Sequence, residues 1–153
     1  MSYRETNIYV SLASSTIVMV YYLANWLGMY REEGLVSDVV FRLWVIVIVA
    51  VIVLNILGNI LTSIVLSISH AIKTQSDKEP RFIEDERDKL IGLKGVQISY
   101  IAFSIGVLLA MLTFVFDRPP LVMFSLIIFF SLLAEIIGDT FQLYFYRRGI
   151  RYG

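Results

Sequence analysis

The chain has 153 residues, of which 58% are hydrophobic and 17% are charged, and its formal net charge is zero. Soluble globular domains use about 45–50% apolar residues, so this composition indicates a membrane protein. The balanced charge gives no reason to expect a nucleic-acid partner. The absence of cysteine excludes a disulfide framework, a thiolate metal site and thiol redox chemistry.

Four apolar stretches are long enough for membrane helices, because a helix needs about 20 residues to cross a hydrocarbon core of about 30 Å. The first exceeds the apolar core of a signal peptide, which has about 7–15 residues, and lacks an Ala-x-Ala site after it. The sequence predicts an all-α integral membrane protein with a single membrane domain over residues 1–153. We expect its helices at about 8–30, 40–70, 82–116 and 119–146, with a cytoplasmic loop at about 71–81.

Polar side chains are sparse in the first two stretches. The second helix carries Asn55 and Asn59 on either side of Gly58, and His70 ends it near the cytoplasm, most simply as a surface residue. One face of the first helix is mildly polar, which more often serves packing than a pathway. Its members are Ser11, Ser15, Tyr22 and Asn25.

The segment 81–94 follows a polar linker and is rich in charges at helical spacing, such as Arg81 with Asp85. We therefore expect the third helix to begin in the cytoplasm. Exposed ion pairs are weak, so these charges could simply solvate the helix start. The alternative is a surface that docks a soluble partner. Its residues would be Glu84, Asp85, Glu86, Arg87 and Asp88.

The third helix has a face of small residues, which favours close packing against a neighbouring helix. The tight turn Asp117-Arg118-Pro119-Pro120 follows it, and its prolines suit the start of the fourth helix. The small residues are Gly92, Gly95, Ser99, Gly106 and Ala110.

The fourth stretch contains two carboxylic acids, Glu135 and Asp139, inside the apolar run 121–146. Each would cost a few kcal/mol if it faced lipid in its charged form. Because residues three or four apart share a helix face, both acids lie on one stripe with Ser131 and Gln142. The sequence therefore places its unusual chemistry on this face.

An internal repeat links the two halves of the chain. Asn55-Ile-Leu-Gly-Asn59 matches Glu135-Ile-Ile-Gly-Asp139, and Tyr22-Leu-Ala-Asn-Trp-Leu-Gly-Met29 matches Tyr100-Ile-Ala-Phe-Ser-Ile-Gly-Val107 at a similar separation. Chance similarity between apolar segments is the competing explanation. A true repeat predicts two parallel-repeat hairpins, with Asn55 opposite Glu135 and Asn59 opposite Asp139.

Two acids one turn apart repel each other, and a low dielectric disfavours their charged forms. Their oxygens suit a proton or a hard cation such as Na⁺, Ca²⁺ or Mg²⁺, whereas zinc would want His or Cys. The leading hypothesis is therefore a cation or proton site at Glu135, Asp139, Asn55 and Asn59, for transport or ion-linked sensing. The alternatives are that the acids act as interhelical glue, hydrogen-bonded to the asparagines, or that they face the cytoplasmic interface.

Enzymatic chemistry is not indicated. The membrane stretches contain no central lysine for retinal, and the sequence has no His-Glu-x-x-His site, no glycine-rich phosphate loop and no arrangement for acyl transfer. Gly138-Asp139 with Glu135 is a poor substitute for an aspartic protease dyad. We expect a protein without a catalytic centre and without a cofactor other than the cation.

The distribution of basic residues predicts the orientation in the membrane. All but three of the 13 Lys and Arg residues lie at the termini or around the central loop, and cytoplasmic segments collect such residues. Both termini should therefore be cytoplasmic. The three in the outer connections are Arg31, Arg42 and Arg118.

The string Asp85-Glu86-Arg87-Asp88 before the third helix and the ending Tyr144-Phe-Tyr-Arg-Arg-Gly149 carry a family likeness. Over roughly residues 80–150 the chain resembles a family of small prokaryotic four-helix membrane proteins that is classed as a domain of unknown function. The resemblance implies a bacterial or archaeal cytoplasmic membrane and a regulatory context, but no activity or site. Because so small a bundle encloses little space, we also expect a homo-oligomer in the bilayer.

Overall fold

The computed structural model describes residues 3–32, 36–74 and 86–148, and they form four α-helices. Each helix is long and apolar enough to cross a membrane, as the sequence predicts. Their bounds are Tyr3–Glu32 for α1, Ser37–Thr74 for α2, Glu86–Val115 for α3 and Pro120–Arg148 for α4. α1 and α2 extend past their expected limits at both ends, and α4 at its C-terminal end, because the polar residues that flank these apolar cores are also helical, whereas the described part of α3 lies within its expected limits.

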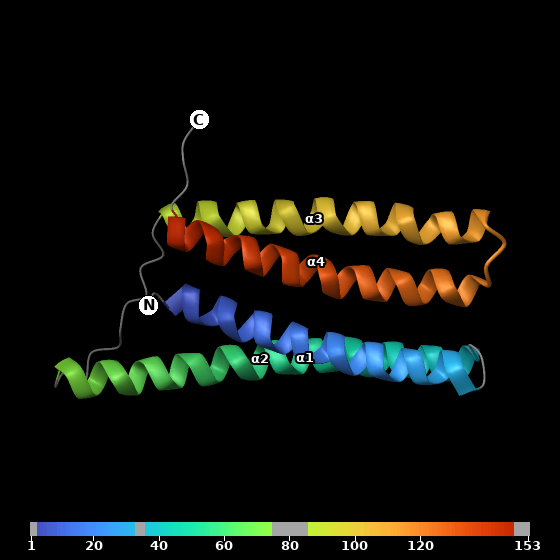
Figure 1. The fold of residues 1–153 in the computed structure, drawn as a ribbon. Helices are drawn as coiled ribbons and strands as arrows, with labels where there is room; N and C mark the ends of the chain where they lie inside the picture. The colour runs from blue at the N-terminus through green and yellow to red at the C-terminus, as the bar shows by residue number, and fades with distance from the viewer. Residues whose placement is uncertain (1–2, 33–35, 75–85, 149–153) are drawn as a thin grey trace.

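The helices alternate in direction, so the start of α1, the end of α2, the start of α3 and the end of α4 gather on one side (Figure 1). We call this side the terminal end, and the side with the α1–α2 and α3–α4 connections the hairpin end. Figure 1 shows α1 and α4 in the middle, with α2 and α3 on the outside. α3 packs chiefly on α4, and α2 chiefly on α1.

The contact between α3 and α4 confirms the predicted small-residue face. Gly95, Gly106 and Ala110 are buried, and Gly138 of α4 lies directly against Ser99 and the backbone of α3. A Cβ atom at Gly95, Gly106 or Gly138 would collide with the facing helix. The absence of side chains at these positions therefore lets the backbones of α3 and α4 approach closely. We call this contact the glycine seam.

The connection at residues 116–119 follows the prediction for the Asp117–Pro120 turn. Asp117 has a φ of 55°, in the left-handed region that Asp tolerates better than most residues. The Arg118 amide then bonds the Thr113 carbonyl at 3.1 Å, which caps the end of α3. α4 begins at Pro120, whose missing N–H group matters least in a first helical turn.

The main hydrophobic core lies where α1, α2 and α4 meet. Tyr22 and Val18 of α1 pack there against Val47 of α2 and Leu132 of α4. Elsewhere the outward faces of α2 and α3 carry exposed large apolar side chains, which suits contact with lipid. Large apolar side chains are therefore found both in the core between α1, α2 and α4 and on the outward faces of α2 and α3.

Candidate functional site

Glu135 and Asn55 meet between α4 and α2. The Asn55 Nδ2 donates to Glu135 Oε1 over 3.5 Å, and both side chains are partly buried. This distance is at the outer limit for a hydrogen bond, so the contact is weak. The rings of Phe41 and Phe124, with centroids 6.0 Å apart, join the same two helices nearer the hairpin end.

Asp139 lies deeper than Glu135 and faces α1 rather than α2. Its side chain is only 8% exposed, and Ser11 of α1 lies close enough to interact with it. One carboxyl oxygen, Oδ2, is buried without any partner. Glu135, one turn away, is close enough to act on it electrostatically. A polar atom left unpaired in this way is uncommon in a folded protein and calls for an explanation.

Asn59 does not join this group. It is exposed, because α2 and α4 diverge toward the terminal end (Figure 1). The two glycines of the repeat do not bring α2 and α4 together either: Gly58 packs on Val10 of α1, and Gly138 packs on α3. The expected meeting of Asn59 with Asp139 is therefore not formed, and the structure gathers Asn55, Glu135 and Asp139 only.

The first helix supplies polar groups in place of Asn59. The face with Ser11, Ser15 and Tyr22 lies against α4, whereas Asn25 is exposed and its Nδ2 bonds the carbonyl of Tyr21 at 2.8 Å. The helical spacing of the serines was a usable signal. That spacing could not show which helix the serine face of α1 would contact. We call the contact between α1 and α4 the polar seam.

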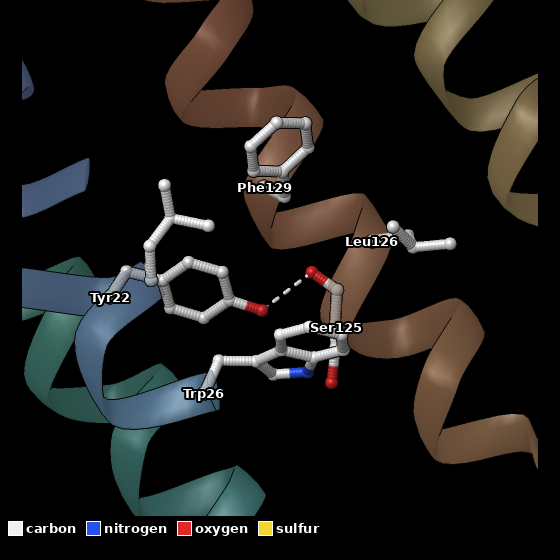
Figure 2. A pocket seen from close by; sticks show the side chains of 6 residues that line it. Tyr22, Trp26, Ser125, Leu126 and Phe129 are labelled. Atoms are coloured by element: carbon white, nitrogen blue, oxygen red, sulfur yellow. Dashed lines mark hydrogen bonds between the residues drawn. The ribbon is translucent and has the colours of Figure 1, made fainter. Parts of the chain in front are cut away.

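Near the hairpin end the polar seam contains a pocket of about 220 Å³ (Figure 2). Figure 2 shows Tyr22 reaching across from α1, where its hydroxyl donates to the carbonyl oxygen of Ser125 at 2.7 Å. The exposed wall of the pocket is almost wholly apolar, with Trp26 on one side and Phe129 on the other. This part of the seam is therefore held by one hydrogen bond, and its lining contains no carboxylate and no basic side chain.

The proposed docking residues are divided by their contacts. Glu84 and Asp85 lie outside the described residues, and Glu86 is exposed. Asp88 accepts a bond of 2.7 Å from the Tyr146 hydroxyl, and Arg87 donates to the Tyr146 carbonyl at 3.2 Å. Both residues thus tie the start of α3 to the end of α4. The side chain of His70 also lies outside the described residues.

Other basic residues at the terminal end contact aromatic side chains. Arg147 donates to the Tyr9 hydroxyl at 2.8 Å, which links α4 to α1. The Arg148 guanidinium lies 5.4 Å from the centre of the Tyr144 ring, within cation–π range. Cationic and amphipathic aromatic groups together are typical of a membrane–water interface.

Within residues 3–32, 36–74 and 86–148, no three His, Cys, Asp or Glu side chains are grouped closely enough to hold a metal ion. The two acids and Asn55 thus supply few charged ligands for a divalent ion, which takes six or more oxygens. A proton or a single positive charge matches this set better. No protein-family model, curated protein or solved structure matches the chain.

Proposed function

We propose that the chain is a multi-pass membrane protein that binds a cation or a proton at Glu135 and Asp139, with Asn55 as a neutral partner, for transport or ion-linked sensing. The burial of Asp139 beside a second carboxylic acid, on a helix able to span a membrane, carries the proposal. Ionisable groups inside a membrane bundle are expensive, and they commonly mark a path for ions or protons.

The arrangement of the two acids gives such a ligand a reason to bind. Charges on Glu135 and Asp139 would repel each other across one helical turn, in surroundings with few compensating groups. A proton on either acid, or a cation near both, removes that repulsion. A ligand that binds only the folded state also stabilises it.

A purely structural role fits the geometry less well. Interhelical glue would need short hydrogen bonds between the acids and their neighbours. The Asn55–Glu135 contact is long, and one oxygen of Asp139 has no partner. These two observations favour a site that is completed by a ligand.

For the setting we propose a prokaryotic cytoplasmic membrane with the terminal end inside. Cytoplasmic segments collect Lys and Arg, and the described part of the chain has more of them at the terminal end than at the hairpin end. Those at the terminal end are Arg4, Lys73, Arg87, Lys89, Lys94, Arg147 and Arg148. The exposed apolar faces of α2 and α3 leave room for a second copy, which supports the proposed homo-oligomer.

Thermal unfolding in detergent tests the proposal. The parent and the double variant Glu135→Gln with Asp139→Asn are compared across pH and with added Na⁺, Ca²⁺ or Mg²⁺. We expect the midpoint of the parent to shift with pH or with one ion, and the double variant to lose the shift because its amides cannot ionise. Thr140→Val, an exposed change on the same helix, is the control.

The proposal fails if the parent ignores both pH and ions while the double variant unfolds at the same temperature. The docking of a cytoplasmic partner at residues 81–94 stays a separate prediction. No described contact favours it, since Arg87 and Asp88 already bind Tyr146. Docking is tested by a pulldown with residues 81–94 scrambled. If scrambling removes no bound protein, the result counts against docking.

A further inference from the structure

Among the described residues, three buried side-chain oxygen atoms have no hydrogen-bond partner, and all three belong to the two helices that form the polar seam. They are Asn7 Oδ1 and Ser15 Oγ on α1 and Asp139 Oδ2 on α4. Each could accept a hydrogen bond or bind a cation. Buried polar atoms are usually satisfied, so unpartnered oxygens on both helices of the polar seam point to something that binds there.

Ser15 is the most informative of the three. It is only 1% exposed, yet its hydroxyl bonds nothing. A helical Ser or Thr has an easy alternative, which is to donate to the carbonyl one turn earlier. In this protein Thr16, Thr62 and Thr140 do so at 2.7–2.8 Å. The Ser15 hydroxyl is instead available to the seam.

The register of the two helices places Ser15 level with Glu135, about one turn from Asp139 toward the hairpin end. α1 and α4 are antiparallel, and two contacts fix their alignment: Ser11 with Asp139, and Tyr22 with Ser125. Ser15 lies one turn from Ser11 toward the hairpin end. Helical side chains lean toward the N-terminus of their own helix. Ser15 therefore leans toward the terminal end and Asp139 toward the hairpin end, which makes the gap between the two side chains shorter than the separation of their backbones.

We propose that a small monovalent cation, Na⁺, binds in the polar seam between the Asp139 carboxylate and the hydroxyl oxygens of Ser11 and Ser15. Asn7, one turn nearer the terminal end than Ser11, offers a further oxygen on the path from that side. The inference rests on the proposed function and names its ion and its ligands. In this site the hydroxyl oxygens of α1 replace the predicted ligand Asn59.

The charge of the site selects a monovalent ion. The described groups that face Asp139 from α1 are neutral, and Glu135 is the one titratable neighbour on its own helix. The proposed ligands are the Asp139 carboxylate and neutral oxygens of α1, with Glu135 one turn away outside this set, and they balance a single positive charge; oxygen ligands also suit a hard ion. A proton on Asp139 would compete with Na⁺ for the same oxygen. Binding should therefore strengthen as the pH rises.

The full chain in detergent provides the test, with the unfolding midpoint followed while NaCl replaces choline chloride at constant ionic strength. We expect Na⁺ to raise the midpoint of the parent, more at pH 8 than at pH 5.5. K⁺ should give a smaller shift. Asp139→Asn should abolish the response, and Ser15→Ala should weaken the apparent affinity by about tenfold, the loss expected for one ligand.

Thr62→Val is the matched control, since Thr62 is a buried hydroxyl that bonds its own helix and lies outside the seam. This variant should keep the full response. An unaltered Na⁺ affinity in Ser15→Ala would overturn the assignment of α1 as a ligand donor. If the unfolding midpoint of the parent shifts with pH but not with Na⁺, the Na⁺ inference is wrong and the proposal of a proton site is retained. If the midpoint shifts with neither, both proposals are wrong.

Discussion

The two seams of α4 use opposite means to hold a helix in place. Against α3 it presents Gly138, and the backbones approach until no side chain fits between them. Against α1 it presents Asp139, the very next residue, and the contact is polar and incompletely paired. Close packing gives a fixed distance between helices, whereas unpaired polar groups leave a place for a ligand. On α4, Gly138 thus holds the helix against α3, while the next residue, Asp139, supplies the ionisable group.

Adding a side chain within the glycine seam should lower the free energy of unfolding most. A Cβ at Gly138 would overlap Ser99 and lie 3.1 Å from the carbonyl oxygen of Gly95, so Gly138→Leu should destabilise the fold by about 3 kcal/mol. Thermal unfolding followed by tryptophan fluorescence measures this change. Gly28→Leu is the control, because no atom lies within 4 Å of a Cβ there. Equal losses in the two variants would mean that the seam is not tightly packed.

Removing the hydrogen bond between Tyr22 and Ser125 in the polar seam should cause a smaller loss of stability. Tyr22→Phe deletes the 2.7 Å bond to the Ser125 carbonyl, at a cost of about 1 kcal/mol in the same assay. Tyr100→Phe changes the matching residue of the repeat, which is 71% exposed, and should have no effect. If both substitutions are neutral, this bond does not help to hold α1 against α4.

The tie at the terminal end should be weaker because water competes there. Tyr146→Phe removes the 2.7 Å bond to Asp88 and should lower the free energy of unfolding by about 0.5 kcal/mol. Since Asp88 is charged, the loss should shrink as salt is added. A loss as large as that of Tyr22→Phe, and insensitive to salt, would argue against an interfacial position.

The smallest effect should come from the α2–α4 contact. Asn55→Ala loses a bond of 3.5 Å and should cost only a few tenths of a kcal/mol. Asn59→Ala, one turn away and exposed, should cost less still. Unfolding in the two variants, measured side by side, ranks them. A larger loss for Asn59 would revive the four-residue site that the sequence predicts.

Local features of the fold were predictable from the sequence. The four helices follow from apolar length, and the glycine seam follows from the spacing of Gly95, Ser99 and Gly106. Both signals lie within one helix, so neither depends on how the helices assemble. The Asp117–Pro120 turn was predictable for the same reason.

The partners of the acids were not predictable, because they depend on the order of the helices. The predicted repeat aligns Asn59 with Asp139, but equivalent positions in two halves need not touch. Tyr22 is buried while its counterpart Tyr100 is exposed, so the halves have different surroundings. Only the position of α1 beside α4 shows that Ser11 meets Asp139.

The adjacency of Gly138 and Asp139 has a mechanical consequence. Because the glycine seam leaves no space for sliding, α3 and α4 should move as one rigid lever. Any rearrangement that opens Asp139 to water would then displace this lever as a whole from α1 and α2. A change in the contacts of one buried carboxylate would thus be transmitted to both ends of the α3–α4 pair.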